Sequence, residues 1–275
     1  MSRIEKPIVR SKLRSKLGML YYGGIRRLMC IKLRKTFART RRSDSLPHLH
    51  FEHKTPLLRK LRDVDMQLQY NKITNLKIAA GCIDGIVIRP GEIFSYWKLI
   101  GNPTAARGFL DGMILHNGKV ISGTGGGLCQ LSNLIFWSAL HTPLTIIERH
   151  RHGFDVFPDS NRTQPFGSGA TCYYPHGDLM IRNDTDHTFQ LRVNVGEKYL
   201  EGQWRCDAPP LYIYNIVERD HEMKSEYWGG YSRHNKLYRQ TFDGEGNLIS
   251  EELVFENSAI MMYPPFLSEN NSNNI

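Results

Sequence analysis

The sequence lacks the long apolar runs that membrane-spanning helices require. No stretch approaches the roughly twenty consecutive apolar residues of a span. The nearest candidate for the apolar core of a secretory signal, residues 17–22, is short, and arginines resume at Arg26. A small-residue cleavage site is also missing. These absences lead us to expect a cytoplasmic protein.

Cysteine is scarce, and its pattern is irregular. Five cysteines are an odd number, they are widely scattered, and no two form a C-x-x-C pair. This pattern argues against a disulfide framework and against a cysteine-rich zinc site. We therefore expect reduced thiols in a reducing compartment.

Acidic residues are almost missing from the first part of the chain. Residues 1–42 carry fourteen Lys or Arg and the single acid Glu5, a net charge of +13, whereas residues 43–275 carry 22 basic and 26 acidic residues, a net charge of −4. Leucines and isoleucines are interleaved with the basic residues of this arm. That mixture suits an anionic membrane surface, which would place the protein at the inner face of a membrane. A solvated basic tail is nevertheless the first expectation, with membrane contact as its alternative, and no motif supports nucleic-acid binding.

The most distinctive stretch is a glycine run followed by a cysteine. Gly125, Gly126 and Gly127 lead into residues 128–141, whose apolar residues recur at helical spacing. A helix start would place Cys129 beside free N–H groups and the positive end of the macrodipole, which lower the pKa of a thiol. Alternatively, Cys129 is an inert core thiol and the glycines permit close packing or bind an anion.

Histidines follow the apolar strand predicted at residues 144–149. Alternation places Glu148, His150 and His152 on one face of an extended strand. A helix followed by a strand can return the chain beside its start, so either imidazole is a candidate base for Cys129. No carboxylate has the usual spacing of a metal site, and we expect neither a metal nor another cofactor.

Turn and strand patterns predict an α+β fold, a largely antiparallel sheet with a few helices, one of which starts at the glycine-rich loop. Asn117-Gly118 between two apolar runs is the clearest hairpin signal. Helices are expected around residues 73–84 and 128–141, and Phe94, Tyr96 and Trp97 are expected in the core. Further strands are predicted at 86–88, 170–174 paired with 179–182, 189–195, 199–205, 211–217, 237–242 and 248–255.

Four parts are expected along the chain. The basic arm, residues 1–42, precedes a connecting segment, residues 43–70, whose prolines and histidines predict irregular structure at 43–56. The main domain spans residues 71–265. A polar tail, residues 266–275, follows it.

Four ordered motifs resemble the VanW family, which is called after an accessory protein of vancomycin-resistance gene clusters. They lie at residues 89–95, 125–130, 144–149 with a following histidine, and 178–185. The resemblance runs roughly from Asn71 to Val195. It implies a role in glycopeptide resistance or cell-envelope metabolism, with a peptidoglycan precursor or peptide as partner.

Within this resemblance we hypothesise a Cys–His enzyme of the acyl-transfer or hydrolytic type, acting on peptidoglycan-related peptides. The preferred base is His152, because the family pattern carries a histidine after the Glu-Arg pair. The assigned residues are Cys129 as nucleophile, His152 or His150 as base, Glu148 or Asp178 as its orienting group, and Gln130 as oxyanion donor.

Two other hypotheses stay open. One is a noncatalytic module in which Gly125, Gly126, Gly127 and the aromatic residues bind an envelope precursor or a partner protein. The other is a scaffold protein held at the membrane by its basic arm.

Overall fold

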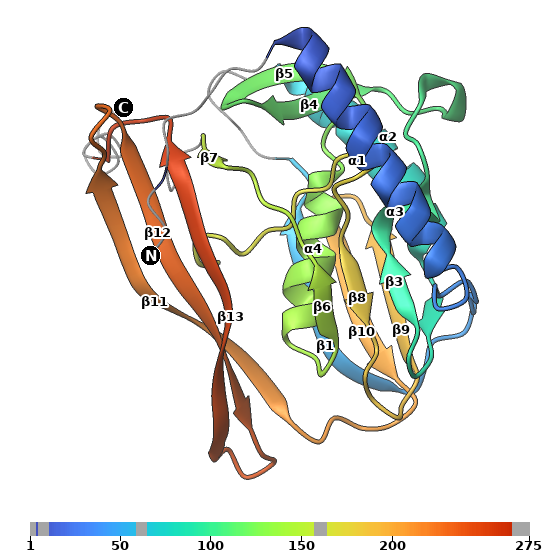
Figure 1. Ribbon diagram of the computed structural model, residues 1–275. Coiled ribbons are helices and arrows are strands. Elements are labelled where there is room, and N and C mark those ends of the chain that lie inside the picture. Colours follow the sequence, from blue (N-terminus) through green and yellow to red (C-terminus); the bar gives the residue numbers. More distant parts are fainter. Residues whose placement is uncertain (1–3, 5–10, 59–64, 157–163, 266–275) are drawn as a thin grey trace.

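The computed structural model describes Ile4 and residues 11–58, 65–156 and 164–265 (Figure 1). The predicted polar tail, 266–275, lies outside the described residues. The helices are α1 (Lys12–Lys32), α2 (Met66–Ile83), α3 (Tyr96–Ile100) and α4 (Cys129–Leu140), with a 3-10 turn at Ala105–Arg107. The strands are β1 (His48–Pro56), β2 (Ile86–Ile88), β3 (Ile93–Ser95), β4 (Asp111–His116), β5 (Lys119–Thr124), β6 (Thr145–Glu148), β7 (Phe154–Asp155), β8 (Met180–Arg182), β9 (Phe189–Val195), β10 (Tyr199–Cys206), β11 (Ile213–Ser225), β12 (Tyr231–Phe242) and β13 (Leu248–Met261).

These strands form mostly antiparallel sheets, which confirms the predicted α+β fold. The main sheet has the order β1-β10-β9-β2, and a second sheet has the order β11-β12-β13-β7, in which the short β7 runs parallel to β13. A small sheet, β3-β8-β6, and the β4-β5 hairpin complete the set. The long strands of the second sheet stand at one side of the molecule (Figure 1).

The core lies between the main sheet and helices α2 and α4. The helical spacing of apolar residues in α4 buries Leu131, Leu134 and Ile135 on the sheet side. Trp204 of β10 is fully buried, and its ring meets Phe94 edge to face, with centroids 6.5 Å apart. Burial of these apolar side chains holds α4 firmly, and so fixes the position of Cys129 at its first residue.

The predicted hairpin at Asn117-Gly118 is confirmed. Both residues have positive φ, 48° and 75°, as the tightest hairpin turns require. Strand β5 then leads into the glycine run, where a Cβ on Gly126 would lie 2.1 Å from the carbonyl carbon of Gly112. The absence of a side chain at Gly126 thus allows the loop to pack directly against the backbone of β4.

The connection predicted to be irregular contains a strand. Residues 48–56 form β1, which pairs with β10 along the edge of the main sheet. Exposure alternates along this strand, and the ring of Phe51 stacks on His141 of the α4 C-terminus at a centroid distance of 4.0 Å. Its histidines are therefore strand residues, which the prolines on either side obscured.

The prediction that residues 170–174 pair with residues 179–182 in a hairpin is wrong. Only an isolated bridge joins Tyr173 to Gly177 in this part of the described chain, and β8 pairs with β3 and β6 instead. The backbone of this segment finds other partners. Thr171 donates its N–H to the carbonyl of His150 at 2.8 Å, and Ala170 donates to the Asn133 side chain at 2.8 Å.

The basic arm contributes a helix that is integrated with the folded body, in contrast to a solvated tail. After α1, Phe37 is buried with Ile93 and Met180, and Ala38 donates its N–H to the Ile93 carbonyl at 2.9 Å. Within the described segments, every helix is too short or too polar to traverse a bilayer.

We predict that His141→Phe reduces the acid sensitivity of the fold. Burial lowers the pKa of His141 to about 4 from its usual 6.5. The unfolded chain therefore binds more protons between these values, and stability falls as pH drops from 6.5 towards 4, by up to about 3 kcal/mol. Urea unfolding at several pH values measures this loss. Parallel profiles for the wild type and the variant would contradict the assignment.

Candidate functional site

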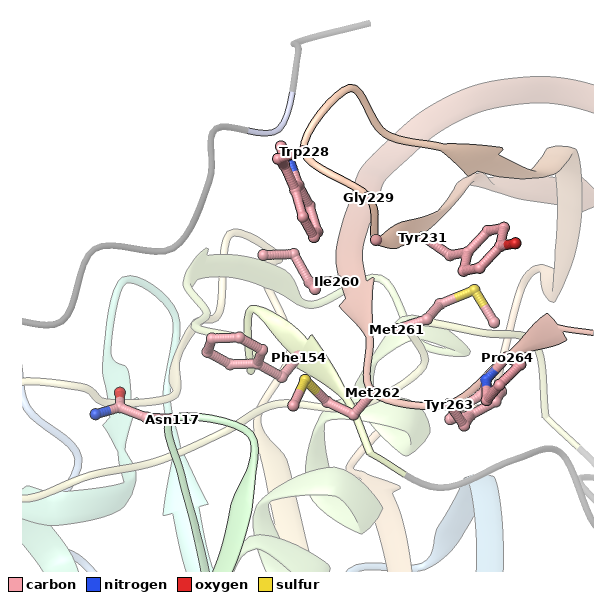
Figure 2. A pocket seen from close by; sticks show the side chains of 11 residues that line it. Asn117, Phe154, Trp228, Gly229, Tyr231, Ile260, Met261, Met262, Tyr263 and Pro264 are labelled. Atoms are coloured by element: carbon pink, nitrogen blue, oxygen red, sulfur yellow. The ribbon is translucent and has the colours of Figure 1, made fainter.

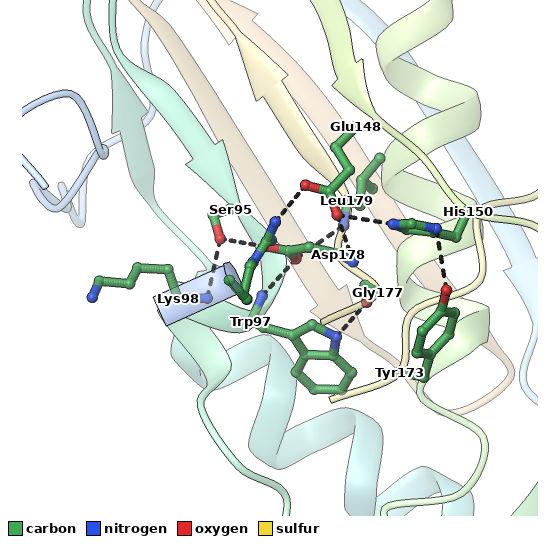
Figure 3. A network of polar contacts seen from close by, with 10 residues as sticks. Ser95, Trp97, Lys98, Glu148, His150, Tyr173, Gly177, Asp178 and Leu179 are labelled. Carbon is green, nitrogen blue, oxygen red and sulfur yellow. Dashed lines mark hydrogen bonds and ion pairs between the residues drawn. The ribbon is translucent and has the colours of Figure 1, made fainter. Parts of the chain in front are cut away.

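A buried arginine of α1 joins two carboxylates from distant parts of the chain. Arg26 forms ion pairs with Glu148 at the end of β6 and with Asp178 just before β8 (Figure 3). The side chains of Arg26, Glu148 and Asp178 are 9%, 20% and 1% exposed. Ion pairs that are this well shielded from water are weakly screened, so each charge depends strongly on its partner.

Asp178 is held by several donors besides Arg26. The hydroxyl of Ser95 donates to it at 2.5 Å and the backbone N–H of Trp97 at 2.9 Å. The indole N–H of Trp97 donates in turn to the carbonyl of Gly177 at 2.8 Å. Burial raises the pKa of Asp178 above its usual value, although the hydrogen bond from Ser95 and the charge of Arg26 oppose that rise.

Glu148 connects this buried pair to an imidazole near the surface. Nε2 of His150 lies 2.9 Å from Oε1 of Glu148, and Nδ1 lies 3.2 Å from the hydroxyl of Tyr173. Burial acts to raise the pKa of Glu148, but the hydrogen bonds from His150 and Arg26 outweigh it and hold the pKa below its usual value. An ionised Glu148 fixes the ring of His150 with Nε2 protonated and leaves Nδ1 to accept from Tyr173.

Aromatic side chains surround the outer end of this network. We call Tyr22, Tyr173, Tyr174 and His176 the aromatic rim. His176 stacks on Tyr22 of α1 at a centroid distance of 6.0 Å and meets Tyr173 edge to face at 5.1 Å. The three tyrosines are between 42% and 52% exposed. The rim therefore presents rings and hydroxyl groups to solvent above a rigid polar base.

Among the described residues, the thiol of Cys129 makes no hydrogen bond with Arg26, Glu148, His150 or Asp178. Cys129 is the first residue of α4, as predicted, and its thiol contacts the carbonyl of Cys172 at 3.9 Å. Burial raises the pKa of Cys129, the opposite of what an activated thiolate needs. No hydrogen bond in the described part of the chain joins this thiol to His150 or His152. Burial also lowers the pKa of His152, so its imidazole favours the neutral form.

The predicted ligand-binding glycines use their N–H groups internally. All three donate to backbone carbonyls: Gly125 to Leu110 at 3.0 Å, Gly126 to Gly123 at 3.0 Å and Gly127 to Met113 at 2.9 Å. The amide of Gln130 donates to the Thr55 hydroxyl and the Pro56 carbonyl, at the end of β1. The arrangement gives these residues a role in packing, while ligand binding by them stays a prediction.

The structure thus joins Glu148, His150 and Asp178 by hydrogen bonds, whereas Cys129 and Gln130 have other hydrogen-bond partners. Arg26 and Tyr173 are the members that sequence reasoning missed. Arg26 is one of fourteen basic residues in the arm, and nothing in the sequence sets it apart. Tyr173 could have been found from the sequence, because it belongs to an aromatic pair at 173–174 that is followed by a proline and a histidine. No metal-like cluster of His, Cys, Asp or Glu occurs among the described residues.

A separate cavity of about 530 Å³ lies between the β4-β5 turn and the end of the second sheet (Figure 2). Aromatic and sulfur-containing side chains line it, including Phe154, Trp228, Tyr231 and Met262. Its described lining contains no acidic, basic or histidine side chain. The hydroxyl of Tyr263, a lining residue, donates to Asp155 at 2.8 Å, and Asp155 pairs with Arg233, so a second buried polar cluster adjoins this cavity.

Comparison with known proteins identifies the family. The Vancomycin B-type resistance protein VanW of Enterococcus faecalis (strain ATCC 700802 / V583) is 36% identical over 244 residues, which cover 89% of this chain and 87% of that protein. A family model described as VanW like protein matches residues 71–205. The chain belongs to the VanW family.

A second relative is more distant. The Uncharacterized protein YoaR of Bacillus subtilis (strain 168) is 28% identical over 122 residues, which cover 43% of this chain and 38% of that protein. No solved structure matches the chain. The family assignment confirms the resemblance seen in the four motifs, and Glu148, His150 and Asp178 all lie within or beside those motifs.

We predict that Arg26→Met destabilises the fold by about 3–5 kcal/mol, because it leaves two shielded carboxylates without their cation. Adding Asp178→Asn should recover part of the loss. Thermal and urea unfolding measure both effects. Arg27→Met, at the exposed neighbouring position, is the matched control and should cost less than about 0.5 kcal/mol. Equal losses for Arg26→Met and Arg27→Met would refute the role of the ion pairs.

We predict that iodoacetamide labels Cys129 with an apparent pKa above about 8.5, the value of a free thiol, because burial disfavours the thiolate. His150→Ala and His152→Ala should leave that value unchanged. Mass spectrometry of each cysteine over a pH series gives the measurement. A pKa well below 8.5 that one histidine variant raises would instead support the Cys–His hypothesis.

Proposed function

We propose that this protein is an accessory factor of glycopeptide resistance or cell-envelope metabolism that binds a peptide-bearing envelope precursor without transforming it. The aromatic rim is the binding surface, with His150 at its base. The name of the E. faecalis relative links the family to vancomycin resistance. The ligand class follows from that link and from the chemistry of the rim.

The observation that carries this proposal is the chain of contacts from Asp178 to the surface. Arg26 forms an ion pair with Glu148, and Glu148 is hydrogen-bonded to His150. The ring of His150 is hydrogen-bonded in turn to the hydroxyl of Tyr173. Each polar group in this chain of contacts therefore has a partner before a ligand arrives, so His150 and Tyr173 are preorganised. Tyrosine rings offer a large contact area at a small entropic cost, and their hydroxyls pair with amides and sugar hydroxyls.

A Cys129-dependent acyl transfer or hydrolysis is the second candidate function. Its support is the position of Cys129 at the start of α4, where the helix dipole favours a thiolate. The raised pKa of the thiol and its contact with the Cys172 carbonyl favour the binding function instead. The two candidates differ in what they require of Cys129, and one experiment can separate them.

The test is the binding of a fluorescein-labelled muramyl pentapeptide, followed by fluorescence anisotropy. We expect Tyr173→Ala to weaken binding by about tenfold or more, because it removes the rim ring that contacts both His150 and His176. Tyr212→Ala is the matched control, since Tyr212 is 44% exposed and Tyr173 is 42% exposed. The control and Cys129→Ser should bind as the wild type does.

Two results would overturn the binding function. One is a lack of specific binding at the rim, seen either as no binding by the wild type or as equal losses of affinity for Tyr173→Ala and Tyr212→Ala. The other is conversion of the probe by the wild type that Cys129→Ser abolishes, detected by chromatography of the same samples. That second result would establish the enzymatic candidate.

A further inference from the structure

The outward face of α1 is an apolar stripe that the folded body leaves uncovered. Leu13, Leu20 and Leu28 are 69%, 74% and 70% exposed. Leu17 lies nine residues before Arg26, about two and a half helical turns, and so on the opposite side of the helix from the buried guanidinium. The other large apolar side chains exposed along the helix are Met19, Tyr21, Tyr22, Ile25 and Ile31.

Basic residues flank this stripe on both sides. Helical spacing places Arg14 and Lys32 along one edge and Lys16 and Arg27 along the other, and all four are exposed. No acidic residue occurs in α1. An apolar face between two rows of cations is complementary to a surface with an apolar interior and an anionic rim of head groups.

The helix also has the position that such contact requires. In Figure 1, α1 lies at the periphery of the molecule, on the side away from the second sheet. Arg26 fixes the inner face of α1 to the body through Glu148 and Asp178, so the apolar stripe is held facing outward. A surface helix of a soluble protein normally turns its apolar face to the core and its charges to water. Here the exposed face is the more apolar one.

We propose that the outward face of α1 binds an anionic lipid bilayer, with the apolar stripe in the head-group region and the flanking cations on lipid phosphates. This contact places the aromatic rim beside the membrane surface, because Tyr22 of the same helix stacks on His176. The lipid contact rests on α1 alone and does not depend on what the rim binds.

The experiment is flotation of the full chain with vesicles of phosphatidylglycerol and, separately, of phosphatidylcholine. The wild type should float with phosphatidylglycerol, and salt should weaken the association. Leu17→Gln with Leu20→Gln should lower the partition coefficient at least about tenfold. Arg14→Gln with Arg27→Gln should lower it roughly thirtyfold, at about 1 kcal/mol for each charge.

Matched controls distinguish binding through this surface from nonspecific adsorption of the protein to vesicles. Leu211→Gln with Ile213→Gln changes apolar residues that are 70% and 63% exposed near the second sheet. Lys77→Gln with Lys198→Gln changes exposed lysines elsewhere. Both control pairs should float as the wild type does, and thermal unfolding should confirm that every variant is folded.

Three outcomes would overturn the membrane contact. The wild type stays in solution with phosphatidylglycerol vesicles, or the α1 variants float as well as the controls do. In the third, light scattering shows a dimer that Leu17→Gln with Leu20→Gln dissociates, which would assign the stripe to a second copy of the chain. The vesicles contain no muramyl peptide, so a failure here is distinct from a failure of ligand binding at the rim.

Discussion

The arrangement of the candidate site depends on the ion pairs of Arg26 with Glu148 and Asp178. Taking three charged groups out of water costs several kcal/mol for each ion, and only close partners with further hydrogen bonds offset that cost. Here Ser95 and the Trp97 N–H satisfy Asp178, and His150 satisfies Glu148. One guanidinium therefore fixes the position of α1, the end of β6 and the turn before β8 at once.

Two side chains that the sequence suggested as a catalytic pair, Cys129 and His150, have different hydrogen-bond partners. Cys129 begins α4 and Glu148 ends β6, the next strand along the chain. The imidazole of His150 nevertheless turns to Glu148 and Tyr173, while the thiol of Cys129 faces the carbonyl of Cys172. The polar network reaches the surface through Tyr173, and burial disfavours the thiolate of Cys129. The geometry therefore fits recognition better than nucleophilic attack.

The parts of the fold with local signals could be predicted from the sequence. Asn117-Gly118 has the residues that its turn demands, the apolar period of α4 matches its buried face, and β9 lies where alternation placed it. Glu148, His150 and Asp178 were also candidates. Arg26 was beyond reach, because its partners are 122 and 152 residues away and only tertiary packing selects it from the other basic residues of the arm. Strand β1 was missed for a similar reason, since its pairing with β10 decides its structure.

The length of these separations affects the order in which the protein takes shape during synthesis. Residues of α1 leave the ribosome before the carboxylate of Asp178 that anchors them, which is made about 150 residues later. At ordinary translation rates this interval is on the order of ten seconds. During this interval, the cations and leucines of α1 have no folded body to pack against. A nascent chain of this kind meets its surroundings through α1 before its own core exists.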